Sequence, residues 1–108
     1  MNYLRQEKLK AELVKAGFWE ANAPYDPTRN WTALEELCER LQQRLAEAVC
    51  LFVHPLNGRK TTYQVLLNYE NDNLVIGLGE DIYEAICTAA IKLPSLFAEH
   101  PEYAATNS

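Results

Sequence analysis

The sequence predicts an α+β fold: a three-stranded antiparallel meander with helices on both faces, an α/β/α sandwich in the element order α-α-β-β-β-α. Three observations lead to this prediction. Residues 31–48 repeat apolar side chains at helical spacing, and residues 81–93 do the same. Between them, short β-prone runs are separated by turn residues, which is typical of a meander. We expect one domain, with an N-terminal helical segment at 1–19, a linker at 20–30, an αβββα core at 31–94 and a tail at 95–108.

The first helix is predicted over residues 3–16, where apolar side chains recur at helical spacing and a glycine follows. Pro24 and Pro27 exclude a helix from the linker, because proline lacks the backbone N–H and fixes φ. Two aromatic residues near these prolines, Trp19 and Tyr25, are expected to be exposed. Exposed aromatic side chains favour protein interfaces.

The second helix is predicted to begin between residues 27 and 32, because Thr32 and Glu35 have the spacing of a capping box. Its apolar stripe starts at Trp31, which we expect to lie in the core. The stripe continues through Leu34, Leu37, Cys38, Leu41, Leu45 and Ala48.

The first strand is predicted at residues 50–54 and is expected to end at Pro55. The pair Asn57-Gly58 then favours a hairpin, because both residues tolerate positive φ. The second strand, at residues 61–69, alternates, and one of its faces carries Tyr63, Val65, Leu67 and Tyr69.

A polar turn at residues 70–73 leads to a third strand at 74–78. Apolar residues on both sides of the second and third strands, such as Leu66 and Val75, indicate that both faces of the sheet are at least partly covered. This is the observation behind the predicted three layers.

The last helix is predicted over residues 81–93. Asp81 lies three residues before Glu84, which is the spacing of a capping box, and both acids complement the helix N-terminus. Alanines on the apolar face of the helix permit a close approach to the sheet. Pro94 is expected to end the helix, and the tail after Tyr103 is expected to fray.

The charge balance argues against direct binding of nucleic acid. Ten Lys and Arg stand against fifteen Asp and Glu, a formal charge of -5 at pH 7, whereas nucleic-acid binding needs a basic surface. Gly77-Leu78-Gly79 before a helix resembles part of a phosphate loop, but the acids that follow would repel phosphate. No apolar run is long enough to predict a membrane-spanning helix.

The acids of residues 70–84 are the candidate partner-binding site. No basic residue interrupts this segment, and a block of one charge sign favours a partner of the opposite sign. A solvated turn and a helix cap account for the same acids without a partner, so both interpretations stay open. The predicted acidic patch consists of Glu70, Asp72, Glu80, Asp81 and Glu84.

No catalytic residue, metal site or cofactor is predicted. Cys38, Cys50 and Cys87 are odd in number and lack metal-site spacing, which favours free thiols in a reducing compartment, the host cytoplasm. Spacing alone leaves open a nucleophile–base pair of Cys50 or Cys87 with His54.

The alternative function is the binding and sequestering of a small molecule or nucleotide. Its candidate residues are Arg59, Lys60, Tyr63 and Tyr69, which would supply cations and aromatic faces. A homo-oligomer is compatible with this function.

Two segments carry a family resemblance. In residues 25–41, YDPTRNWTALEELCERL, a Tyr and an Asp-Pro precede a Trp that opens an amphipathic helix. Residues 79–93, GEDIYEAICTAAIKL, form a closing segment. Both segments resemble the phage ABA sandwich family of small phage and prophage proteins, with Thr88 in place of a basic residue and Tyr83 in place of a proline. The resemblance implies an α/β/α layered fold and a phage or prophage origin, and it implies no catalytic residues.

Together, these observations predict a small phage accessory protein that acts without catalysis. We expect it to bind a host or phage protein with a basic surface through the acidic patch, and so to inhibit a host protein of nucleic-acid handling or defence.

Overall fold

The computed structural model describes residues 1–58, 60 and 62–106. Its strands form one antiparallel sheet in the order β1-β2-β3, so the predicted α+β class, the meander and the element order are confirmed. Among the described residues, no helix has the length and apolar character needed to cross a membrane. The elements are α1 (Tyr3–Lys15), α2 (Trp31–Arg44), β1 (Val49–Leu56), β2 (Thr62–Tyr69), β3 (Asp72–Gly79), α3 (Ile82–Glu99) and a short 3-10 helix, η1 (Pro101–Tyr103).

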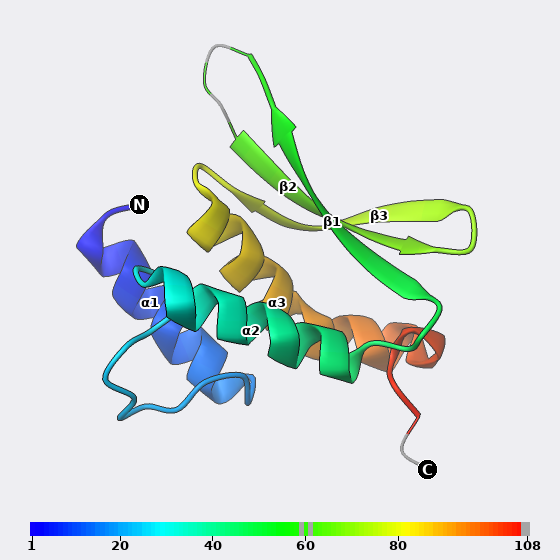
Figure 1. Ribbon diagram of the computed structural model, residues 1–108, viewed down its shortest axis with the longest axis horizontal. Coiled ribbons are helices and arrows are strands. Elements are labelled where there is room, and N and C mark those ends of the chain that lie inside the picture. The colour runs from blue at the N-terminus through cyan, green and yellow to red at the C-terminus, as the bar shows by residue number, and fades with distance from the viewer. Residues whose placement is uncertain (59, 61, 107–108) are drawn as a thin grey trace.

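The layers differ from the prediction in one respect. α3 packs directly on β3 and β2, while α1 and α2 pack against α3, so the described helices lie together on one side of the sheet (Figure 1). No described helix covers the other face, where Phe52 and Leu78 are 54% and 55% exposed. The apolar residues on both faces of the second and third strands were the basis for predicting a third layer. In the part of the chain that the structure describes, a helix covers one of these faces only.

The alternation predicted for β2 is confirmed. Val65 and Leu67 are buried towards α3, and Leu66 points to the opposite face. A β-bulge in β3 leaves Ile76 without a partner on β2 and turns its side chain into the core. Gly77 is consequently paired with Val65 and faces α3.

α3 approaches the sheet most closely at the end of β3. A Cβ atom placed on Gly77 would lie 2.3 Å from the backbone oxygen of Ala85 and 2.8 Å from the Cβ of Ala89. A Cβ atom on Gly79 would lie 2.4 Å from the backbone nitrogen of Ala85. These glycines, which resemble a phosphate loop in the sequence, therefore serve the contact between helix and sheet.

α2 begins at Trp31, within the predicted range, but its capping residue differs from the prediction, and so does the end of α3. Asn30 caps α2 in place of Thr32: its side-chain oxygen accepts a hydrogen bond from the N–H of Ala33 at 2.9 Å. Pro94 lies inside α3 and does not end it. The helix continues because residues beyond the proline, such as Leu96, are buried, and this packing outweighs the loss of one backbone hydrogen bond.

The first strand and the tail also extend beyond the predicted limits. Pro55 belongs to β1, where it is paired with Tyr63. After η1, the N–H of Ala105 donates to the carbonyl of Arg44 at 2.9 Å. The segment just after Tyr103 is therefore held by the end of α2, contrary to the prediction that it frays.

The two tryptophans have the opposite placements from those predicted. Trp19 is buried, with its indole N–H donating to the carbonyl of Tyr25 at 3.0 Å. Trp31 is 54% exposed at the start of α2. Tyr25 is exposed as predicted. The chain turns back after α1 through Gly17, which has φ of 82°, and this turn brings Trp19 onto the core.

Candidate interaction surface

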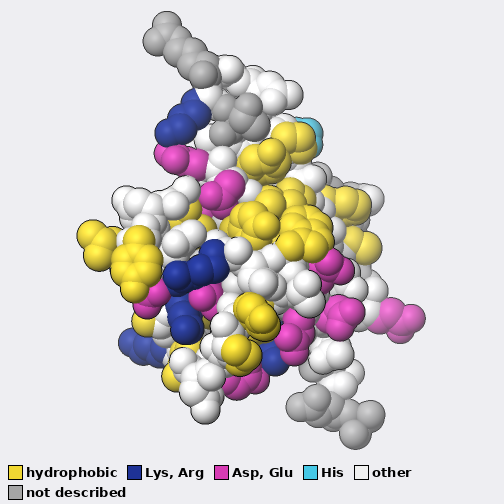
Figure 2. Space-filling view, turned by 60° about the vertical axis from the view of Figure 1, so that its left-hand side comes forward, with side chains coloured by type: hydrophobic (Ala, Val, Ile, Leu, Met, Phe, Trp, Pro, Cys, Tyr) yellow, Lys and Arg dark blue, Asp and Glu magenta, His cyan; other side chains and the backbone are white. Residues whose placement is uncertain are grey.

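The structure divides the five predicted acids between the two ends of β3. Glu70 and Asp72 lie at the β2–β3 turn, whereas the other three acids lie where β3 joins α3 (Figure 1). β3 begins at Asp72 and ends at Gly79, so seven steps of strand, roughly 23 Å at the usual rise, separate the two groups. On the side of the molecule shown in Figure 2, acidic side chains are likewise dispersed over the surface. The single acidic patch predicted from the sequence is not formed.

The acids at the start of α3 have partners within the chain. Asp81 caps the helix by accepting a hydrogen bond from the N–H of Glu84 at 2.8 Å, as predicted. Asp81 also forms an ion pair with the N-terminal ammonium of Met1 at 3.3 Å, and Glu84 pairs with the guanidinium of Arg5 at 3.1 Å. These contacts join α1 to α3 and partly neutralise the acids that a basic partner would need.

The residues of the alternative ligand site do not converge either. Tyr63 and Tyr69 lie at opposite ends of β2, roughly 20 Å apart at the usual rise of a strand. The Nζ atom of Lys60 lies 2.6 Å from a carboxylate oxygen of Glu80, and this contact lowers the pKa of Glu80. Arg59 lies outside the described residues.

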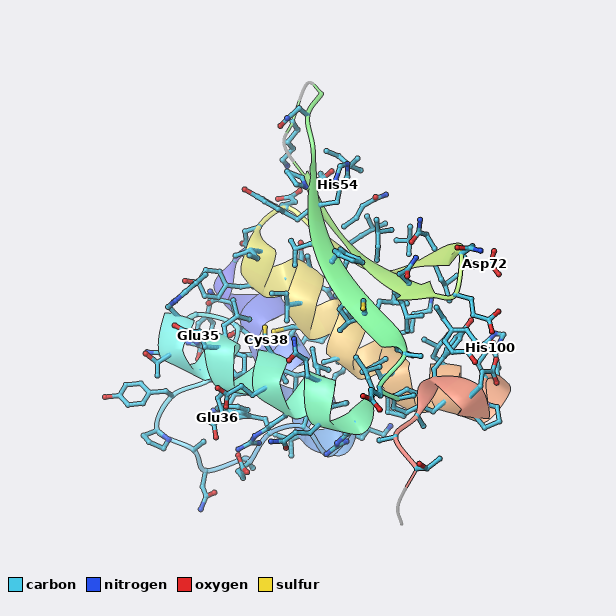
Figure 3. The ribbon with its side chains drawn as sticks, turned by 45° about the vertical axis from the view of Figure 1, so that its right-hand side comes forward. Glu35, Glu36, Cys38, His54, Asp72 and His100 are labelled. Carbon is cyan, nitrogen blue, oxygen red and sulfur yellow. The ribbon has the colours of Figure 1, made fainter. Side chains whose placement is uncertain are left out.

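The thiols of the core are poorly suited to nucleophilic chemistry. Burial raises the pKa of the Cys38 and Cys87 thiols, so both thiols are protonated at neutral pH. Figure 3 shows Cys38 on α2 and His54 near the tip of the β1–β2 hairpin, well apart. Cys50 is exposed on β1. Within residues 1–58, 60 and 62–106, no cluster of three or more His, Cys, Asp or Glu side chains could hold a metal ion.

A hollow of about 750 Å³ lies between the linker and α2. Arg40 lines this hollow and donates to the carbonyl of Phe18 at 2.7 Å. The same guanidinium also pairs with Glu20 at 3.1 Å and Glu36 at 2.9 Å, and it lies over the ring of Trp19. Its hydrogen-bond donors are thus engaged in fastening the linker to α2, which disfavours an anionic ligand in the hollow.

The sheet is the part of the molecule with the least charge. β1 and β2 contain no Asp, Glu, Lys or Arg, and Asp72 is the single charged residue of β3, although 23% of the whole chain is charged. The strand pairing defines which residues share the uncovered side of the sheet. We call this side the outer face; it consists of Cys50, Phe52, His54, Leu56, Thr62, Gln64, Leu66, Asn68, Asn73, Val75 and Leu78.

An apolar row crosses the middle of the outer face. Phe52 lies directly opposite Leu66, which in turn lies opposite Val75, so the row spans all three strands. Leu78 lies beside this row on β3, and Phe52, Val75 and Leu78 are all exposed. Single exposed apolar residues are ordinary, whereas a contiguous exposed group marks an interaction site.

The two edge strands of the sheet differ in how they are covered. At β3, the hydroxyl oxygen of Thr88 lies 3.3 Å from the N–H nitrogen and 3.1 Å from the carbonyl oxygen of Leu78, so α3 covers this edge at Leu78, while residues 72–75 of the strand are exposed. β1 pairs with β2 through eight residues without a bulge, and its residues from Phe52 to Leu56 are all exposed. β1 is therefore a regular strand with an uncovered edge.

No family model, curated protein or solved structure matches this chain. The phage origin implied by the resemblance therefore stays a prediction. The outer face was not predicted from the sequence. A sequence signal for it exists, because neither β1 nor β2 contains a charged residue.

Proposed function

We propose that this protein is a non-catalytic binding module whose contact surface is the outer face of its sheet. The observation that supports the proposal is the exposed apolar row on a face without a single Asp, Glu, Lys or Arg. Each Å² of apolar surface that a partner covers contributes about 25 cal/mol. Because the face bears no ionised carboxylate, ammonium or guanidinium, this burial is not opposed by the cost of removing such ions from water.

The chemistry of the outer face indicates what kind of partner it can bind. A complementary partner is a protein whose contact surface is apolar at its centre and uncharged. Gln64, Asn68 and Asn73 lie on the same face as the apolar row and supply hydrogen-bonding groups, as in other protein interfaces. A nucleic acid would need cations, and a basic protein would need acids, and the outer face has neither. The predicted role in protein binding is kept, while the contact moves from the acids to the sheet.

The test compares two leucines that are both exposed. Leu78→Arg places a charge on the outer face, and Leu4→Arg places the same charge on α1, where Leu4 is also exposed. A binding partner is first captured with the unaltered protein and purified, and its dissociation constant is then measured with each variant. We expect Leu78→Arg to weaken binding at least about tenfold, through a loss of about 1.4 kcal/mol, and Leu4→Arg to leave it unchanged.

Equal binding by the two variants contradicts the proposal. The acids are tested in the same assay with Glu80→Lys. If this variant loses the partner while Leu78→Arg keeps it, the contact lies at the junction of β3 and α3, as the sequence predicted.

A further inference from the structure

We propose that β1 pairs antiparallel with β1 of a second copy of this chain, so that two sheets join into one sheet of six strands. The surface concerned is the edge of β1, and the proposal does not depend on the partner of the outer face. It rests on the backbone groups at this edge, on their register and on the absence of charge.

Pro55 identifies the backbone groups that face the open edge. It is paired with Tyr63, and because proline has no N–H, this pair belongs to the kind that exchanges no hydrogen bonds in an antiparallel ladder. Such pairs alternate along the strand, so Leu51 and Val53 also direct their N–H and C=O groups away from β2. The other edge follows the same alternation, since the groups of Leu78 point outward to Thr88.

Two donors remain available at the edge of β1. The N–H of Val49 already donates to the carbonyl of Ala46 at 2.9 Å. No hydrogen bond from the edge-facing N–H groups of Leu51 and Val53 to another described residue is present. The edge therefore presents the N–H groups of these two residues, together with the C=O groups of Leu51, Val53 and Pro55.

One register matches these groups to themselves. If the two-fold axis passes through Phe52, Leu51 of each copy lies opposite Val53 of the other, and four hydrogen bonds engage all four available N–H groups. Pro55, which has no donor, then lies opposite Val49, whose donor is already engaged. A register centred on Val53 would instead leave the carbonyl of Leu51 facing the proline.

The chemistry of β1 favours a second copy as the occupant. A chain with a formal charge of -5 repels its copies, but β1, VCLFVHPL, contains no charged residue. Charges, prolines, bulges and covering elements are the usual means by which proteins prevent pairing at a sheet edge. Among these means, β1 has only the proline near its end. In the proposed register, Phe52 lies beside Phe52 of the second copy, and aromatic cross-strand pairs stabilise sheets.

The first test is the dissociation constant of the dimer, measured by sedimentation equilibrium. Val53→Pro removes one edge-facing N–H group from each copy, so the dimer loses two of its four hydrogen bonds. This loss should raise the dissociation constant of the dimer roughly 30-fold. Proline is tolerated at this kind of position, as Pro55 shows, so far-UV circular dichroism should show a folded monomer. Pro55→Ala is the matched control and should not weaken the dimer, because Pro55 contributes no donor.

The second test determines the register. His54→Cys places a thiol opposite Cys50 of the second copy, in a pair close enough for a disulfide. Mild oxidation should then give a covalent dimer on a non-reducing gel. The unaltered protein should not crosslink, because in this register its Cys50 residues are offset by four residues, about 13 Å.

A protein that stays monomeric up to its solubility limit overturns the proposal of β1 pairing. The proposal of binding at the outer face is tested separately, by the dissociation constant measured with Leu78→Arg. A dimer that Val53→Pro does not weaken, or that His54→Cys does not crosslink, excludes this use of β1.

Discussion

The two edge strands of this sheet are covered to different extents. β3 has a bulge, lies against α3 and has the backbone groups of Leu78 bonded to Thr88. β1 has no bulge, carries no charge and is exposed from Phe52 to Leu56. Since α3 covers the last part of β3, while the edge of β1 is uncovered at Leu51 and Val53, the difference indicates that the end of β3 serves the stability of the fold and that β1 is available for contacts.

The largest effect is expected where β3 meets α3. Gly77→Ala would place a Cβ atom 2.3 Å from the backbone of Ala85, so either the helix or the strand must shift. We expect a loss of about 3 kcal/mol in the free energy of unfolding, which lowers the melting temperature by roughly 15 °C. Gly58→Ala is the control, because a Cβ atom there would have no neighbour within 4 Å. Equal melting temperatures for both variants would show that β3 is not tightly packed.

A smaller effect separates two valines that are paired across β1 and β2. Val65 is 2% exposed and Val53 is 42% exposed, although they lie opposite each other on the same face. Val65→Ala should lower the free energy of unfolding by about 2 kcal/mol, because it removes buried methyl groups and leaves a cavity. Val53→Ala should change it by less than about 0.5 kcal/mol. Urea denaturation in dilute protein measures both, and a similar cost for the two would mean that β1 is as much a part of the core as β2.

The hydroxyl group of Thr88 tests the cover of β3 directly. Thr88→Val keeps the shape of the side chain but removes the oxygen that lies within hydrogen-bond distance of both backbone groups of Leu78. We expect a loss of about 1 kcal/mol in the free energy of unfolding and faster hydrogen exchange at the N–H of Leu78. Thr88→Ser keeps the oxygen and should preserve the slow exchange. If exchange at Leu78 is equally slow without the hydroxyl, another group covers this edge.

The smallest effect concerns the ion pair of Lys60 and Glu80. The pair lowers the pKa of Glu80 in the folded protein, so its contribution to stability is present above the unfolded pKa, about 4.3, and is lost as the pH falls through the lower folded value. Lys60→Ala should return the pKa of Glu80 towards its ordinary value, as measured by an NMR titration. At pH 7 the thermal melt should be almost unchanged, because the pair is exposed. An unchanged pKa would mean that the two side chains do not meet.

Elements with local signals could be predicted from the sequence. The middle of the α2 stripe, the cap at Asp81 and the alternation of β2 each depend on neighbours within a few residues, and each is present in the structure. The ends of the predicted stripe are wrong, because Trp31 is exposed and the helix ends at Arg44, before Leu45 and Ala48. The small residues of α3 also indicated its close approach to the sheet. Pro94 was misjudged because the burial of the residues after it, which keeps α3 helical, depends on tertiary contacts.

The candidate site depended on distances that the linear sequence conceals. Asp72 and Glu80 are close in sequence, but they lie at opposite ends of β3, so the predicted patch is divided. An apolar strand face has the same sequence pattern whether a helix covers it or not, so Phe52 and Leu78 gave no sign of their exposure. The signal that could have revealed the sheet was the absence of charge in β1 and β2.

Amide hydrogen exchange at three residues, measured in dilute and in concentrated protein, tests the division between the two edges most directly. The account predicts that the N–H of Leu78 exchanges slowly at both concentrations, while the N–H groups of Leu51 and Val53 exchange rapidly in dilute protein and slowly in concentrated protein. Slow exchange of Leu51 and Val53 even in dilute protein would contradict the account, because β1 would then be covered within one chain. Rapid exchange at every concentration would contradict the pairing of β1 with a second copy.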